Sequence, residues 1–442
     1  MFKRLSLVIV LLAGLTTLIA SSDVRAKKAF DKKVLLISID GFRPEFYLDA
    51  EKYDLPALQW LKNAGAYAAS VEPVFPTVTY ANHTTLLTGL LPEHHGILSN
   101  TVFTWEAGPT PAWYWEADKI KAPTLNEYVQ KAGGITASMG WPVTLMAKDV
   151  DYLIPEIFSM DGYYEGGDFE VKVKYTDPEL MAEVLNVTTL KRYDNEVEFD
   201  FWTAEASAHI LKTKKPDFMT IHFVDVDHVA HGFGPNAPEV LEALKHTDDN
   251  LKIVFSSINL KDTCVILTGD HGFREVSQKI SPNTLFVKNG WIKLDEKNKL
   301  QSWEVIAHAS GAQAAIYVKN KALLPEVEAL LRANEASGFV VIPKSTLQKL
   351  GAYPEADLAI EGAVGFTVSG SFAGSLVSSS GSVKGQHGFL PTHKELHTGL
   401  VTAGCGLGHG QEWETVHLTD IPATIADILD LKTAKLDGES LD

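Results

Sequence analysis

The sequence has only two cysteines, Cys264 and Cys405, in 442 residues. Small proteins that depend on disulfides for stability carry far more cysteine per residue, so this chain is not a disulfide scaffold. Cys264 lies within an apolar segment, where a buried free thiol is the favoured interpretation. A single bridge between the two cysteines stays open, because sequence spacing does not give their distance in space.

Positive charge is also scarce. The chain has 39 lysine and arginine residues against 56 aspartate and glutamate residues, which gives a net charge of −17. Proteins that bind nucleic-acid polymers present a basic surface to the phosphates, so we expect no such partner. If the substrate is anionic, local positive charge must come from another source, and a metal ion is the first candidate.

Long hydrophobic runs are missing beyond the N-terminus. There, Lys3 and Arg4 precede the apolar run Leu5–Ala20, and small or polar residues follow it as far as Ala26. This order is typical of a secretory signal peptide, and the run is short for a membrane anchor, which needs about 20 residues. We predict that residues 1–26 are a signal peptide, that no stable membrane span remains, and that the protein is exported, either to the periplasm or out of the cell.

Several short apolar segments have the composition of buried parallel strands. The clearest are Val34–Ile39, Phe218–Val224 and Cys264–Thr268. Helical patterns lie between such segments, as at Pro238–Ile258. This alternation predicts the α/β class, with a doubly wound, mostly parallel sheet and helices on both faces.

Residues 275–385 differ from the rest of the chain. They contain strand and helix candidates and a Gly/Ser-rich stretch, but no acidic residue follows a strand candidate directly. We expect a small inserted cap here, on a catalytic α/β domain made of residues 27–274 and 386–442. The acidic, tyrosine-rich region from Tyr152 to Glu198 has little periodicity and is predicted as loop and short helix over one rim of the sheet.

Three strand candidates are followed at once by side chains that bind metals. These are Asp40 after the first strand, Asp227 and His231 after the second, and Asp270 and His271 after the third. A single aspartate in such a place is usually a helix cap, but three strand ends of a parallel sheet meet in one crevice. Mixed carboxylate and imidazole ligands favour zinc over magnesium or calcium.

A candidate nucleophile occurs in the segment 75–89. Pro76 interrupts the chain and a helix is predicted to begin near Tyr80, which places Thr79 at a helix N-terminus. Taken alone, Thr79 is more typical of a helix cap. Beside a metal site, its hydroxyl could lose a proton and attack phosphorus. His387, which is flanked by glycines, is a further candidate ligand.

Six short motifs occur in order along the chain. They are Ile39-Asp-Gly-Phe-Arg43, Pro76-Thr-Val-Thr-Tyr-Ala-Asn-His83, Thr88–Ile97, Asp227–Pro235, Gly269-Asp-His-Gly272 and Gly385-Gln-His-Gly388. Together they resemble the nucleotide pyrophosphatase/phosphodiesterase family of the alkaline phosphatase superfamily, from Val34 to Leu441. The resemblance implies an alkaline phosphatase-like fold and hydrolysis of phosphodiester or phosphoanhydride bonds through a phosphothreonine at Thr79.

The same resemblance implies two zinc ions as cofactors. One would be bound by Asp227, His231 and His387, and the other by Asp40, Asp270, His271 and the Thr79 oxygen. Asn100 matches an asparagine that contacts a non-bridging phosphoryl oxygen. Tyr80 matches a residue that stacks on a base or another group, and His222 falls where some bacterial relatives carry a base-stacking tyrosine.

The expected substrate is a small phosphodiester or a nucleotide, and a glycerophosphodiester or choline-type diester stays open. A sulfatase is excluded because Tyr-Ala-Asn follows Thr79, where that class needs its own Pro- and Arg-containing motif. The closer alternative is a phosphomonoesterase, which carries a Lys and an Arg after a strand in its first half. The corresponding residues 138–144 contain no cation. A non-catalytic binding protein would not need all six ligands and Thr79.

Overall fold

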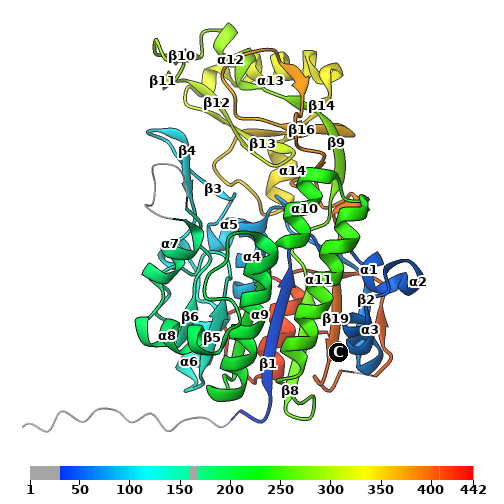
Figure 1. Ribbon diagram of the computed structural model, residues 1–442. Coiled ribbons are helices and arrows are strands. Elements are labelled where there is room, and N and C mark those ends of the chain that lie inside the picture. The colour runs from blue at the N-terminus through cyan, green and yellow to red at the C-terminus, as the bar shows by residue number, and fades with distance from the viewer. Residues whose placement is uncertain (1–29, 160–166, 408, 442) are drawn as a thin grey trace, which may run out of the picture.

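The computed structural model describes residues 30–159, 167–407 and 409–441 (Figure 1). The predicted signal peptide, residues 1–26, lies outside them. A nine-stranded sheet forms the centre of the larger part of the molecule, in the order β20-β2-β19-β8-β1-β7-β5-β6, with β21 also paired to β2. Its strands are β1 (Lys33–Ile39), β2 (Ala66–Glu72), β5 (Thr136–Met139), β6 (Tyr152–Ile154), β7 (Phe218–Phe223), β8 (Thr263–Thr268), β19 (Thr398–Ala403), β20 (Glu412–Trp413) and β21 (Val416–His417).

The middle of this sheet is parallel. β1 pairs in parallel with both β7 and β8, and β5 is parallel to β7 and β6. β19 runs antiparallel to its two neighbours, β8 and β2. The predicted α/β class with a mostly parallel sheet is therefore confirmed.

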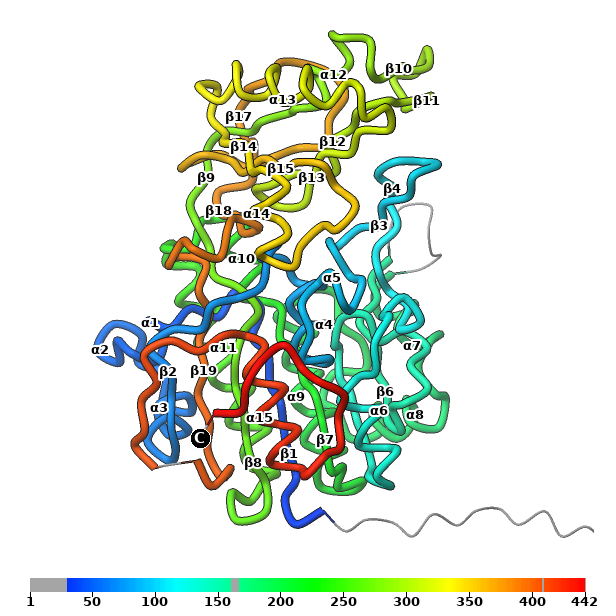
Figure 2. The backbone as a smooth tube through the Cα atoms, turned by 180° about the vertical axis from the view of Figure 1, so that it is seen from behind, coloured from blue at the N-terminus to red at the C-terminus, as the bar shows by residue number. Residues whose placement is uncertain are grey.

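Helices cover both faces of the sheet, so its strands are apolar on both sides. Leu35 and Ile37 of β1 pack into one core cluster, and Leu36 between them packs into the cluster on the opposite face. Figure 2 shows the second face, with α15 in front of the strands. The helices are α3 (Pro56–Ala64), α9 (Glu196–Thr213) and α11 (Pro238–Phe255) on the first face, and α4 (Thr79–Thr88), α6 (Leu125–Lys131) and α15 (Asp420–Ile428) on the second. No helix in the described ranges combines the length and the apolar character that crossing a membrane requires.

Cys264 and Cys405 form a disulfide, so the expectation of a buried free thiol at Cys264 is wrong. Cys264 lies in β8, and Cys405 follows the neighbouring strand β19. Antiparallel pairing places Val265 opposite Ala403, and this register leaves the two cysteines with their Cα atoms 4.3 Å apart. They are 141 residues apart in sequence, and only the strand order brings them together.

The chain between β9 and β18 forms separate, smaller sheets above the carboxyl edge of the central sheet (Figure 1). It leaves and returns through the paired strands β9 and β18, with Glu275 opposite Gly385. The division into a catalytic domain and a cap at 275–385 stays a prediction. The elements are β9 (Arg274–Ile280), α12 (Asn283–Lys288), β10 (Ile292–Leu294), β11 (Leu300–Trp303), β12 (Val305–Ser310), β13 (Gln313–Val318), α13 (Leu324–Ala333), β14 (Phe339–Pro343), α14 (Lys344–Lys349), β15 (Leu358–Gly362), β16 (Gly365–Val368), β17 (Val377–Ser379) and β18 (Gly385–Gln386).

The region from Tyr152 to Glu198 is more regular than its sequence pattern indicates. It contributes the edge strand β6 and two helices, α7 (Asp168–Tyr175) and α8 (Pro178–Val187). The side chain of Asp177 caps α8 by accepting two backbone N–H groups, and Pro178 follows at the first helical position. The remaining elements are α1 (Glu45–Leu48), α2 (Ala50–Tyr53), α5 (Pro92–His95), α10 (Asp225–Phe233) and the hairpin of β3 (Thr101–Thr104) and β4 (Gly108–Trp113).

Candidate active site

Five of the six predicted metal ligands follow β1, β7 and β8 at the carboxyl edge of the central sheet, and the sixth, His387, follows β18. β1 is in register with both neighbours almost to their last residues. The strands therefore end side by side, and Asp40, the start of α10 and Asp270 follow them at the same edge of the sheet. This is where a doubly wound fold binds its ligands.

Gly41 allows the turn after β1. Its φ is +72°, and a Cβ at this position would lie 2.8 Å from the ring of Phe273. The Phe273 ring packs in turn against His231 and His387, at centroid distances of 5.0 and 5.4 Å. A side chain at residue 41 would therefore strain the backbone and push the aromatic wall toward the histidines.

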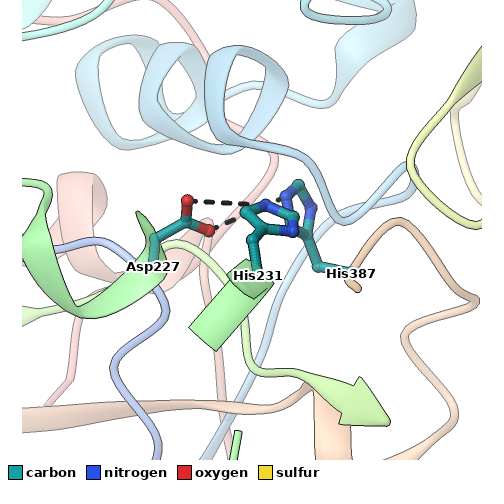
Figure 3. Close-up of side chains that lie close together, drawn as sticks. All are labelled: Asp227, His231 and His387. Atoms are coloured by element: carbon teal, nitrogen blue, oxygen red, sulfur yellow. Dashed lines mark ion pairs between the residues drawn. The ribbon is translucent and has the colours of Figure 1, made fainter. Parts of the chain in front are cut away.

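Asp227, His231 and His387 form a first candidate metal set (Figure 3). Asp227 and His231 lie one turn apart on α10, with His231 Nε2 3.5 Å from Asp227 Oδ2. His387 follows β18, and its Nε2 is 3.8 Å from Asp227 Oδ1. One ligand atom from each residue lies within 4.8 Å of the other two, so a single ion could contact all three.

Asp40, Asp270 and His271 form a second group directly beside the first. His271 Nε2 lies 3.4 Å from Asp40 Oδ1 and 3.1 Å from Asp270 Oδ2. The ring of His271 stacks on that of His387, with centroids 3.7 Å apart. Asp227 also lies within ligand distance of Asp40 and His271, so the two sets adjoin.

The ring orientation of the three histidines leaves Nε2 free in each. Every Nδ1 faces a backbone carbonyl oxygen, to which it donates its proton. The partners are Gly385 for His231, Gly272 for His271 and Thr77 for His387, at 3.0, 3.3 and 2.9 Å. Burial holds the pKa of His271 well below its usual range and lowers that of His387 to about 4. Both rings are therefore neutral, as metal ligation requires.

The carboxylates of the two sets need a cation. Burial, with the charges of Asp227 and Asp270, raises the pKa of Asp40 well above its usual range, and burial raises that of Asp270 to about 7. Within the described ranges, four buried ligand atoms have no hydrogen-bond partner: Asp40 Oδ1, Asp227 Oδ1, Asp270 Oδ2 and His271 Nε2. Orphaned acceptors of this kind are costly, and a bound divalent cation would satisfy all four. The donor set fits zinc.

Thr79 is the first residue of α4 and follows extended Val78. It lines a cavity of about 670 Å³ together with Asn100 and the ligands Asp40, Asp227, His231 and His387. Asn100 Oδ1 accepts the backbone N–H of Tyr80 at 3.0 Å, which leaves its amide NH₂ as a donor. The nucleophile candidate, the predicted phosphoryl contact and four of the six predicted metal ligands thus share one cavity.

Tyr80 lines the cavity but is fully buried. Its ring meets Trp113 and Trp115 edge-on, at centroid distances of 5.2 and 5.9 Å. Its hydroxyl donates to Glu156 Oε1 at 2.9 Å. The ring is therefore held on several sides, and a stacking role for Tyr80 stays a prediction.

Sequence reasoning missed the partners of Asp40. His222, on β7, is 1% exposed, and its Nε2 lies 3.2 Å from Asp40 Oδ2. Its Nδ1 lies 3.0 Å from Glu156 Oε2. Burial lowers the pKa of His222, but the bonds and charges of both carboxylates outweigh burial and raise the pKa well above its usual range. His222 thus holds Asp40 in place, and no sequence signal marked Glu156.

Comparisons with known proteins show what the chain is similar to. In curated proteins, the chain is 27% identical over 260 residues to venom phosphodiesterase CdcPDE of Crotalus durissus collilineatus, covering 55% of this chain and 26% of that protein. It is 29% identical over 260 residues to ectonucleotide pyrophosphatase/phosphodiesterase family member 1 of Rattus norvegicus, covering 55% and 24%. The matched part thus spans about a quarter of the length of these relatives.

Solved structures show the same fold over nearly the whole chain. Murine ectonucleotide pyrophosphatase/phosphodiesterase 5 superposes with a TM-score of 0.65 at 20% identity, covering 92% of this chain and 98% of that one. The human protein gives a TM-score of 0.65 and covers 92% and 97%. The family model for type I phosphodiesterase/nucleotide pyrophosphatase matches residues 34–389. The chain therefore belongs to the type I phosphodiesterase/nucleotide pyrophosphatase family.

Proposed function

We propose that the protein is a zinc-dependent phosphodiesterase or nucleotide pyrophosphatase that reacts through a phosphothreonine at Thr79. The observation that carries the proposal is that Thr79 shares one cavity with Asp40, Asp227, His231 and His387, which belong to two adjoining carboxylate–imidazole groups. The family match over residues 34–389 supports the reaction class. An inactive form of murine ectonucleotide pyrophosphatase/phosphodiesterase 5 was solved in complex with AMP, which supports a nucleotide-like substrate.

Two zinc ions account for the donor atoms at the sheet edge. We assign one ion to Asp227, His231 and His387, and the other to Asp40, Asp270, His271 and the Thr79 oxygen. Bound there, zinc would supply Lewis-acid chemistry that lowers the pKa of the Thr79 hydroxyl and neutralises charge on the leaving oxygen. The orphaned, buried acceptors of both sets support the assignment.

The residues of the chain then perform an in-line displacement. Thr79 Oγ attacks phosphorus from the N-terminus of α4, whose free backbone N–H groups favour negative charge there. The bond to the leaving oxygen breaks, and a water molecule later hydrolyses the phosphothreonine and restores the hydroxyl. The amide of Asn100, fixed through its Oδ1, donates to a non-bridging oxygen throughout.

A diester suits the site better than a monoester. A monoester dianion presents one more charged oxygen, which a phosphatase pairs with cations. Residues 138–144 contain no lysine or arginine, and Trp141 in this segment is buried, with its Nε1–H donated to the carbonyl of His83 at 3.3 Å. The substrate is thus a small phosphodiester or a nucleotide, with the phosphomonoester reaction as the alternative.

The disulfide bond supports the proposal that the protein is exported. The bridge between Cys264 and Cys405 belongs in an oxidising compartment, because thiols are kept reduced in most cytosols. The matched relatives include venom enzymes and ectonucleotide pyrophosphatases. A periplasmic or extracellular location follows as part of the proposal, together with the predicted signal peptide.

A hydrolysis panel tests the proposal. With the metal-loaded protein, bis-p-nitrophenyl phosphate and the p-nitrophenyl ester of thymidine 5′-phosphate should be cleaved about 10²–10⁴-fold faster than p-nitrophenyl phosphate, measured as kcat/KM. Equal or faster cleavage of the monoester would identify a phosphatase instead. Glycerophosphocholine as a further substrate separates a choline-type diesterase from a nucleotide enzyme.

A further inference from the structure

The catalytic cavity contains a buried lysine that the reaction scheme does not use. Lys172 lies on α7, is 3% exposed, and lines the same cavity as Thr79. Its Nζ lies 4.2 Å above the ring centroid of Phe199, a residue of α9 that also lines the cavity. α7 and α9 thus place one ammonium group in the cavity wall.

No residue in the described ranges accepts a hydrogen bond from Lys172 or pairs with it within 4 Å, and its acidic neighbours are engaged elsewhere. Glu156 accepts from the hydroxyl of Tyr80 and faces Nδ1 of His222. Asp200 accepts the backbone N–H groups at the start of α10. The three N–H donors of Lys172 are therefore left without a protein acceptor.

The ammonium group of Lys172 is therefore available to an acceptor that enters the cavity. Burial lowers the pKa of Lys172 to about 8, although the charges of Glu156, Asp168 and Asp200 act in the opposite direction. The group therefore carries its proton at neutral pH for most of the time. A buried ammonium with three unused donors is satisfied best by an anionic oxygen.

The arginine in the described cavity wall is already paired with acidic residues. Arg192 is half-exposed, forms an ion pair with Glu170, and donates to Asp194 at 2.7 Å. A substrate would have to break both contacts to use this guanidinium. Lys172 can bind an anion without losing any existing partner.

We propose that Lys172 forms an anion subsite, which binds a second negatively charged group of the substrate, a phosphate or a carboxylate, away from the reacting phosphorus. Neither Lys172 nor any of the three acids whose charges act on it is a predicted metal ligand. This inference rests on the proposed diesterase function and narrows its substrate to molecules with an additional anionic group.

Three substrates test the subsite in the zinc-loaded protein. The p-nitrophenyl ester of thymidine 5′-phosphate has no second anionic group, its 3′-phosphorylated form carries one on the nucleoside, and ATP carries more on the leaving group. Lys172→Met should lower kcat/KM for one of the two richer substrates by about ten- to hundredfold, and change the plain ester by less than about twofold. The substrate whose rate falls shows whether the subsite binds an anion on the nucleoside side or on the leaving-group side of the reacting phosphorus.

Two further variants make the outcome decisive. Lys172→Arg should keep most of the activity on the affected substrate, and Lys174→Met, which removes an exposed lysine from the same helix, should change none of the rates. An equal loss on all three substrates with a lower Tm would show that Lys172 only balances Glu156 and Asp200, and would overturn the inference. So would unchanged rates. If the unmodified protein cleaves none of the three, the proposed function itself fails.

Discussion

Five of the six predicted metal ligands, all except Asp227, are oriented by a hydrogen bond that the side chain makes elsewhere. His387 is fixed by the carbonyl of Thr77. The hydroxyl of Thr77 donates to the carbonyl of Phe389 and accepts the backbone N–H of Gly388, so it belongs to the support of His387. The hydroxyl of Thr79, in contrast, has no hydrogen-bond partner among the described residues and opens into the cavity. Of the two threonines, only Thr79 is therefore placed to attack.

Thr79→Ala should lower kcat on a diester by at least about 10³-fold, because it removes the hydroxyl on which the proposed covalent intermediate forms. Zinc content should stay close to that of the unmodified protein, since three protein ligands of the second ion remain. Thr79→Ser, which keeps a hydroxyl, should retain measurable turnover. Full activity of Thr79→Ala in steady-state assays would place the nucleophile elsewhere.

At the scale of elements, the position of α10 depends on α9. Asp200 of α9 is 1% exposed, and its carboxylate accepts the backbone N–H groups of Val224 and Asp225 at 3.0 Å each. These N–H groups open α10, which carries Asp227 and His231. Two consecutive helices, separated by β7, thus fix the angle at which Asp227 and His231 face the cavity.

Asp200→Ala should destabilise the protein by about 1–3 kcal/mol, because it leaves these buried N–H groups without an acceptor. It should also weaken zinc binding, since α10 loses its anchor. Asp200→Asn keeps one acceptor oxygen and should lie between Ala and the unmodified protein. The checks are chemical denaturation and zinc competition with a chelator. Unchanged zinc affinity in Asp200→Ala would show that α10 is held by packing alone.

In the whole molecule, the site joins distant parts of the chain. The ligands run from Asp40 to His387, and the last is delivered only after the chain has passed through the cap and returned by β18. Negative charge accumulates where they meet, in a protein whose net charge is already −17. If the proposed cations bind there, they would stabilise the junction between the predicted cap and the central sheet.

Metal analysis of the purified protein should find two zinc ions per chain. Removal by a chelator should abolish diester hydrolysis and lower Tm, because buried carboxylates and imidazoles then face each other without a cation. Added zinc should restore both. Less than one zinc per chain, with activity unaffected by the chelator, would contradict the metal assignment.

Much of this protein follows from local sequence. Val34–Ile39, Phe218–Val224 and Cys264–Thr268 are apolar on both faces, a pattern that only a strand covered on both sides satisfies, and they form β1, β7 and β8. The α/β class and the family followed from these strands and from the motifs at their ends. Asp40 and Asp270 were recognisable because a parallel sheet brings its carboxyl ends together.

The tertiary structure alone decided which distant residues touch. Cys264 meets Cys405 because β19 lies antiparallel to β8, a pairing that neither segment specifies by itself. His222 reaches Glu156 across neighbouring parts of the fold, and Lys172 enters the cavity from a helix in a region with little periodicity. Local sequence patterns indicate which face of an element is buried, because apolar residues recur with the period of the helix or strand. The partner on that face depends on strand order and helix packing, which the whole chain sets together.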